Sequence, residues 1–223
     1  MSLAPLAPLD ALAAAQLLRL ASPALPIGGF AWSGGLEGAI AEGLVADPAA
    51  AQAWIHALIA YGHGRWDAPL LFAMLTSPTH REALNVRYLA SRETHELRAE
   101  TLQTGTSLMR LLAALTPDHA RPRNDVALPL AWTLAAEVWQ VPPAAALLGW
   151  LTAVLDNQIA VLQKALPLGQ VAAQRLHAAL LPTLVAVHTQ AQTLPEDDWS
   201  SSLPGLAIVS SRHETQYSRL FRS

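Results

Sequence analysis

The sequence predicts an all-α, single-domain protein of 223 residues, a helical bundle packed around one central buried helix. Apolar residues recur at three- and four-residue steps in several long segments, which is the spacing of a helix with one buried side. Hydrophobic residues make up 52% of the chain, enough for one sizeable core. Residues 206–209 are the only candidate for a strand, and a weak one.

The central helix is predicted at about residues 143–166. One side of this helix carries an apolar row made of Leu148, Leu151, Leu155, Ile159, Leu162 and Leu166. Much of the other side is apolar as well, through Trp150, Val154 and Val161. A helix that is apolar nearly all round belongs in the interior. Gly149, Thr152, Asp156 and Asn157 interrupt it too often for a membrane span.

The remaining elements are predicted in chain order around that helix. Asp10 is an N-cap for a helix to about residue 21. A short helix begins near residue 33 or 34, and a long one at residue 48 continues to 76 with a break at 62–64. Another helix starts at residues 77–78, further helices cover residues 90–115, 130–140 and 167–190, and residues 117–129 form a loop. The ends, residues 1–9 and about 205–223, are expected to be flexible tails of the one domain, 1–223.

Residues 22–43 begin with a loop, ahead of the short helix near residue 33 or 34, and the shape of this loop is specified by its own residues. Pro23 and Pro26 stiffen the backbone, whereas Gly28 and Gly29 permit positive φ. The loop presents two aromatic residues around these positions, and it is either a structural staple or a contact surface.

Composition excludes several classes of function. The formal net charge of −3 provides no basic field for nucleic acid. The chain has no cysteine, which fits a reducing cytoplasm, and its start lacks the positive region of an export signal. Because only 14% of the residues are charged, we expect apolar surface to be covered by a partner or a second copy.

The sequence offers no catalytic or metal-binding motif. It contains no GxxxxGK[ST], HExxH or GxGxxG pattern, and residues 31–35 match GxSxG only in part. The histidines are scattered: His56 and His63 lie two helical turns apart, about 10 Å, too far to share one ion. We therefore predict no catalytic residues, no metal ligands and no cofactor bound by this chain.

A helical enzyme is the alternative from another class. Its site would combine Glu93, His95, Glu96 and Arg98, but Glu–His neighbours point in different directions on a helix. Arg92 and Glu96, four apart, are expected to pair on a solvated face instead.

Two groups of polar residues require partners. Asp156, Asn157 and Lys164 lie on the otherwise apolar central helix, so they either satisfy one another or line a wet groove or channel. Residues 210–223 mix arginines with Tyr217, Leu220 and Phe221, a composition typical of interface anchors, although a frayed tail is the other reading.

Four stretches carry a resemblance to a known family. LASPALPIGGFAWSGGLE near the start, SRETHELRAETLQTG in the middle, PLGQVAAQRL after the central helix and SRHETQYSRLFRS at the end resemble the UreF family of urease accessory proteins. The resemblance implies a non-enzymatic, all-helical, cytoplasmic chaperone that forms a homodimer. It would bind a UreD/UreH-type accessory protein and link it to the GTPase UreG on apo-urease, with nickel and GTP acting on those partners.

The resemblance also suggests site residues. The surface for the UreD/UreH-type protein is expected to include Pro26, Gly28, Gly29, Phe30, Trp32, Arg212, His213, Glu214, Gln216, Tyr217, Arg219, Leu220 and Phe221. A face toward UreG, or a channel, is expected to include Glu37, Arg92, Glu93, Glu96, Arg98, Asp156, Asn157, Lys164 and Gln170. A direct nickel-binding carrier remains a further alternative.

Overall fold

The computed structural model describes residues 9–200 and 203–223 and is all-α, as predicted, with no strand in those ranges. Residues 1–8, which hold most of the first predicted tail, lie outside the described residues. The α-helices are α1 (Ala11–Ala21), α2 (Leu36–Ala41), α3 (Pro48–Ala57), α4 (Ala68–Thr76), α5 (Arg81–Ala90), α6 (His95–Leu115), α7 (Leu128–Val138), α8 (Pro143–Ala165), α9 (Gln170–Ala191) and α10 (Pro204–His213). The other helical elements are the 3-10 helices η1 (Gly29–Ala31), η3 (Pro78–His80) and η4 (Glu196–Asp198) and the π-helix η2 (Leu58–Asp67).

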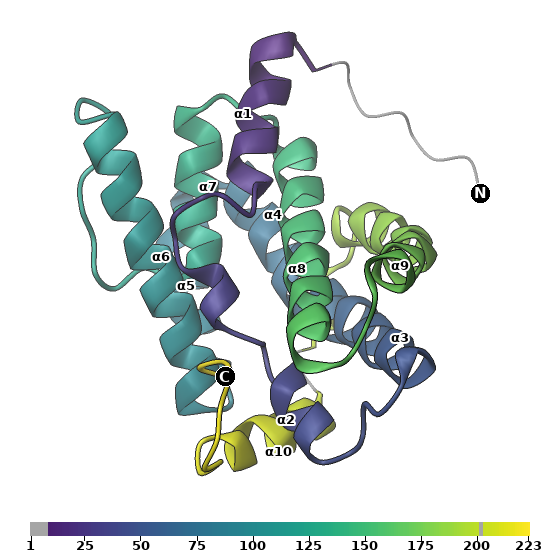
Figure 1. The fold of residues 1–223 in the computed structure, drawn as a ribbon. Helices are drawn as coiled ribbons and strands as arrows, with labels where there is room; N and C mark the ends of the chain where they lie inside the picture. The colour runs from purple at the N-terminus through teal and green to yellow at the C-terminus, as the bar shows by residue number, and fades with distance from the viewer. Residues whose placement is uncertain (1–8, 201–202) are drawn as a thin grey trace.

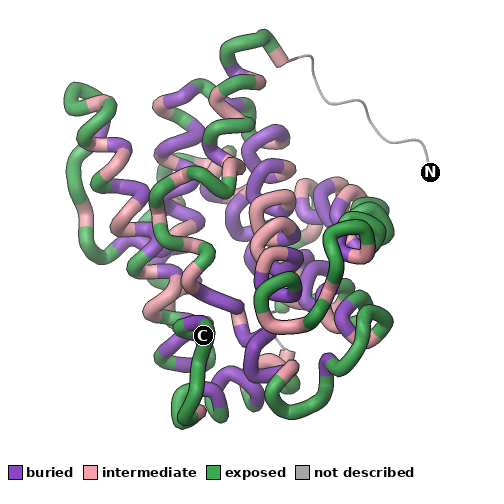
Figure 2. Tube along the Cα trace, in the orientation of Figure 1, coloured by how far each residue is buried: buried purple, intermediate pink, exposed green. Residues whose placement is uncertain are grey.

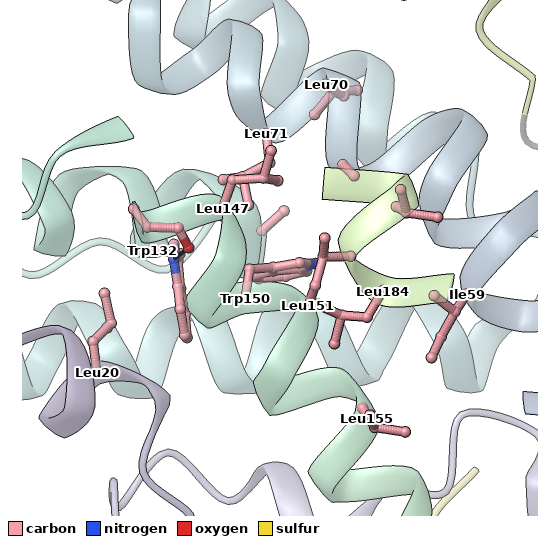
Figure 3. Packing of buried hydrophobic residues seen from close by; sticks show 14 of the residues in the cluster. Leu20, Ile59, Leu70, Leu71, Trp132, Leu147, Trp150, Leu151, Leu155 and Leu184 are labelled. Atoms are coloured by element: carbon pink, nitrogen blue, oxygen red, sulfur yellow. Dashed lines mark hydrogen bonds between the residues drawn. The ribbon is translucent and has the colours of Figure 1, made fainter. Parts of the chain in front are cut away.

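Helix α8 is the central helix, and its predicted position is confirmed. It lies among α1, α2, α4 and α9, and Figure 1 shows it in the middle of the bundle. Its inner residues are buried (Figure 2), and the rings of Trp132 and Trp150 meet edge to face with centroids 5.4 Å apart. Leu147, Leu151 and Leu155 point into the same core (Figure 3).

Helix α8 is long and apolar enough to span a membrane. Of its most apolar 18-residue window, however, 61% is buried inside the fold. Burying a leucine side chain is worth about 1.5–3 kcal/mol, which is the driving force that places such a helix in the core of a soluble protein.

Helices α3 and α4 are joined without the break predicted at residues 62–64. Residues Leu58–Asp67 form a π-helix that follows α3 directly and leads directly into α4. Gly64 allows α9 to come close, because a Cβ there would lie 2.9 Å from Val187 of α9, and it would also lie 2.8 Å from the Ile59 carbonyl oxygen of the same π-helix. The glycines therefore serve packing rather than chain reversal.

The helix predicted at residues 90–115 begins later than expected, and a separate helix precedes it. Helix α5 ends at Ala90, and α6 begins at His95 with Thr94 as its N-cap, whose hydroxyl accepts from the Leu97 N–H at 3.2 Å. Because Arg92 precedes the helix, it does not face Glu96, and the predicted solvated pair between these residues is wrong. Arg92 instead pairs with Asp67 at 3.2 Å.

The C-terminal segment also differs from expectation. Residues 206–209, the weak strand candidate, lie inside helix α10, and the expected flexible tail about residues 205–223 is packed against α2 and α6. Figure 1 shows this yellow segment at the base of the bundle. Val209, His213 and Phe221 are buried there, and burial of these side chains holds the segment in place.

Candidate functional site

The three stretches that resemble a known family at the start, middle and end of the chain meet at one place. The tail (residues 214–223) lies across the N-terminal loop (residues 22–35), and the Arg222 N–H donates to the Ala31 carbonyl at 2.9 Å. The backbone N–H groups of Ser33 and Gly34 donate to the Ser223 hydroxyl at 3.1 and 3.0 Å. Residues about 190 positions apart thus form one surface.

Glu37 of α2 holds the tail through hydrogen bonds to its backbone. Its carboxylate accepts from the backbone N–H groups of Leu220 and Phe221 at 2.7 and 2.9 Å, and it contacts the His213 ring at 3.1 Å. Gly35, with φ of +83°, turns the chain into α2 just before it. Glu37 is buried, and these three contacts offset the loss of water around its carboxyl oxygens.

His213 of α10 and Glu96 of α6 lie next to Glu37 and also help to hold the tail. The His213 side chain has 0% exposure, and its Nδ1 lies 2.7 Å from Glu96, which also accepts from Arg219 at 2.8 Å. We call Glu37, Glu96, His213 and Arg219 the tail anchor. It includes two residues expected on each of the two predicted surfaces.

The N-terminal loop is fixed to α8 by two side-chain amides. Asn157 donates to the Trp32 carbonyl at 3.1 Å, and Gln158 donates to the Ser33 carbonyl at 3.0 Å. Lys164, further along α8, donates to the Leu220 carbonyl at 3.2 Å and lies over the Phe221 ring. Asp156 points elsewhere and contacts His177 at 3.0 Å.

The residues expected to bind a UreD/UreH-type protein separate into an exposed and a buried group. Trp32, His213 and Phe221 are buried, and Gly29 and Gln216 are half-buried. The others are exposed, namely Pro26, Gly28, Phe30, Arg212, Glu214, Tyr217, Arg219 and Leu220. Tyr217 is fully exposed and Leu220 is 55% exposed, so the tail presents apolar surface on a fixed backbone.

The residues expected to face UreG or a channel lie in three places. Glu37 and Glu96 belong to the tail anchor, whereas Arg98, Lys164 and Gln170 are exposed. Arg92, Glu93, Asp156 and Asn157 line a cavity of about 190 Å³ beneath the N-terminal loop. The set therefore does not form one continuous face.

The cavity also contains polar residues that the motifs did not single out. Burial alone would raise the pKa of Asp67, but the charges of Arg92 and His63 hold it below its usual range. His63 Nδ1 lies 2.5 Å from Asp67, and this i, i+4 spacing was the only sequence signal for the pair. Buried side-chain atoms without a partner here include Gln158 Oε1, Asn157 Oδ1 and Arg92 Nε.

Within residues 9–200 and 203–223, no group of three or more histidine, aspartate or glutamate side chains has the geometry of a metal site. The residues of the alternative enzyme do not converge either. Glu93, His95 and Arg98 are exposed, whereas Glu96 is buried against His213.

Glu100 gives a pH-dependent prediction. Burial raises the pKa of this carboxyl from 4.5 to about 7, so the folded state binds more protons than the unfolded state between these values. Stability should therefore fall as pH rises from 4.5 to 7. Glu100→Gln should add about 1–3 kcal/mol to the unfolding free energy at about pH 8 and little at about pH 4.5, as measured by urea denaturation.

The matched control for this prediction is Glu82→Gln. A hydrogen bond from Arg123 holds the pKa of Glu82 below its usual range, so the exchange should lower stability slightly at neutral pH. A Glu100→Gln variant that gains nothing at high pH would show that the carboxyl is not penalised by burial.

Comparisons with known proteins agree with the motifs. The sequence model of a family described as UreF matches residues 45–181. The chain is 49% identical to the urease accessory protein UreF of Ectopseudomonas mendocina, over 93% of this chain and 97% of that relative. It is 48% identical to that of Azotobacter vinelandii (93% and 97%) and 47% identical to that of an Azoarcus species (93% and 94%).

Proposed function

The chain belongs to the UreF family of urease accessory proteins, non-catalytic proteins of urease nickel-centre maturation, and we propose that it acts there as a scaffold. In this proposal, the exposed residues of the tail and of the N-terminal loop bind a UreD/UreH-type accessory protein. The GTPase UreG is then linked to apo-urease through the assembled complex, and nickel and GTP are handled by those partners.

One observation carries the proposal: apolar and cationic side chains are displayed on a backbone that is fixed from beneath. Tyr217 and Leu220 project outward, while the Leu220 N–H is held by Glu37. Tyrosine and arginine dominate the energetics of protein interfaces, and a fixed backbone lowers the entropy lost on binding. Phe30, 39% exposed, extends the surface from the N-terminal loop.

Other partner assignments follow from surface chemistry. Two copies would pair through apolar helical faces, and we propose that Leu12 and Leu18 of α1, which are exposed, take part in this contact. The exposed charges Glu93 and Arg98 near the start of α6 are proposed as contacts for UreG. We place this assembly in the cytoplasm and expect neither nucleic acid nor membrane to take part.

The test is co-purification of the Tyr217→Ser, Leu220→Ser double variant with the UreD/UreH-type protein of the same operon. Because both side chains are exposed, circular dichroism and thermal unfolding should be unchanged, while affinity falls at least tenfold. The control is Val86→Ser with Leu115→Ser, which removes two exposed apolar side chains from α5 and α6. Full binding by the tail variant would refute the assignment.

Calorimetry distinguishes the proposed scaffold from a direct nickel carrier. Titration of the purified protein with nickel should give no stoichiometric binding if this chain is a scaffold alone. Binding at one ion per chain or per dimer would favour the carrier.

A further inference from the structure

Two consecutive peptide groups of the N-terminal loop are hydrogen-bonded on both sides. Toward α8, the Trp32 carbonyl accepts from the Asn157 side chain at 3.1 Å, and the next carbonyl along the chain accepts from Gln158 at 3.0 Å. Toward the tail, the N–H groups of the same two peptide groups donate to the Ser223 hydroxyl at 3.1 and 3.0 Å. In Figure 1 the loop passes here between α8 and the yellow C-terminal segment.

The geometry of a peptide group links its two sides. No peptide bond in the described residues is cis, and in a trans peptide the C=O and the N–H lie in one plane and point in opposite directions. A side-chain amide of α8 that holds the carbonyl therefore also fixes the direction of the N–H, which points away from α8 and toward the tail. Because two such groups follow one another, both N–H groups are directed at one oxygen. Asn157 and Gln158 thus act on Ser223 through the backbone of the loop.

The Ser223 hydroxyl is buried and uses every hydrogen bond that it can form. A hydroxyl has one donor and two lone pairs. This one accepts the two loop N–H groups and donates to Glu100 Oε2 at 3.2 Å. Beside it, the Ser33 hydroxyl donates to the Ser223 carbonyl, and the Arg222 N–H donates to the Ala31 carbonyl at 2.9 Å. The loop therefore holds residues 222 and 223 only while its peptide groups keep their direction.

The two side-chain amides of α8 are explained by the loop rather than by the core. Their oxygens, Asn157 Oδ1 and Gln158 Oε1, are buried and have no partner among the described residues, so the hydrogen bonds of these amides are those to the loop. Gln158 is only 3% exposed. A buried amide that is half-paired is less favourable than an apolar side chain of the same shape. Core stability alone would therefore favour apolar residues at both positions.

We propose that Asn157 and Gln158 are positioning residues of the docking surface, which hold the N-terminal loop in the conformation that receives the tail. The proposal deepens the scaffold function and rests on it, because the loop and the tail carry the residues assigned to the UreD/UreH-type partner. Phe30 of the loop and Leu220 of the tail then keep fixed positions relative to each other. The partner meets one surface whose two parts are joined through the central helix.

The test begins with Gln158→Met in the full chain without partners, and Asn157→Leu is an independent second variant. Each new side chain has a similar size and a good helix propensity but cannot donate to the loop carbonyl. Amide exchange measured by nuclear magnetic resonance should become about tenfold faster at Ser33, Gly34 and Arg222, because their partners are no longer held in place. Helical circular dichroism should be unchanged.

Two comparisons separate positioning from general loosening. The amides of Leu220 and Phe221 bond to Glu37 and should exchange as in the parent. The control variant is Thr152→Val, which removes from α8 a hydroxyl that donates to the Leu148 carbonyl of the same helix, and it should leave exchange in the loop and the tail unchanged. Parent-like exchange at Ser33 and Gly34 in both amide-free variants would overturn the proposal. No partner is present in this experiment, so that outcome would leave the scaffold function untouched.

Affinity for the UreD/UreH-type protein completes the test. Gln158→Met should bind about fivefold more weakly than the parent, but in a Ser223→Ala background the same change should have little further effect, because the hydroxyl through which it acts is gone. An equal loss in both backgrounds would mean that Gln158 acts through stability, against the proposal. If Gln158→Met binds fully while the Tyr217→Ser, Leu220→Ser variant does not, the positioning role fails and the scaffold function stands. If both bind fully, the assigned surface fails as well.

Discussion

Gly105→Ala is expected to lower the free energy of unfolding by about 3 kcal/mol, a large effect for one methyl group. Gly105 lies in α6 where the segment entering α7 crosses it. A Cβ at this position would lie 2.3 Å from the Val126 carbonyl oxygen and 2.8 Å from the Leu128 nitrogen. Because the neighbours are backbone atoms, α6 and α7 must move apart, and the gain in helix propensity of about 1 kcal/mol cannot compensate.

The same displacement would also break a hydrogen bond. The Leu128 N–H donates to the Thr101 hydroxyl at 3.0 Å across this contact. Thermal unfolding should show a midpoint about 6–12 °C lower than that of the parent. Gly205→Ala in α10, where a Cβ would have no neighbour within 4 Å, is the control and should be neutral or stabilising. Equal midpoints for both variants would mean that α6 and α7 are less tightly packed than described.

Glu37→Ala is expected to release the tail and to abolish binding of the UreD/UreH-type partner. The change leaves His213 Nε2 and the N–H groups of Leu220 and Phe221 without their acceptor. Leaving a buried donor without an acceptor costs about 1–3 kcal/mol, and two such donors belong to the tail, so docking of the tail is strongly destabilised. Trypsin should then cut after Arg219 and Arg222 at least tenfold faster than in the parent, because the population of the open tail rises.

Glu37→Ala should release the tail without unfolding the rest of the protein. We expect the helical circular dichroism of Glu37→Ala to be retained, because α8 and its neighbours are packed without the tail. Glu93→Ala removes an exposed carboxylate from the same middle stretch and should leave cleavage unchanged. A Glu37→Ala tail that resists trypsin would show that the carboxylate is not its anchor.

The helical core could be predicted from the sequence because its signals are local. The N-cap at Asp10 and the apolar row of α8 depend on residues within a few turns, and both are confirmed. The start of α6 was missed since Arg92 and Glu96 have suitable spacing for a pair within a helix, yet Thr94 begins the helix between them.

The site could be predicted only as a set of stretches, not as an arrangement. The exposed residues of the tail carry an interface composition that is visible in the sequence. The buried contacts of His213 with Glu37 and Glu96 join residues 176 and 117 positions apart, and no periodicity links such positions. The pKa shifts of Glu100 and Asp67 could not be predicted for the same reason, because they arise from the surroundings of these side chains in the folded chain.

Hydrogen–deuterium exchange of this chain, alone and with the UreD/UreH-type protein, tests most directly whether the anchored tail is the docking surface. We expect protection on binding to increase in the N-terminal loop around Phe30 and in the tail from Tyr217 to Leu220, while α5 around Val86 is unchanged. A footprint confined to other helices, with the tail exchanging as in the free protein, would contradict the account.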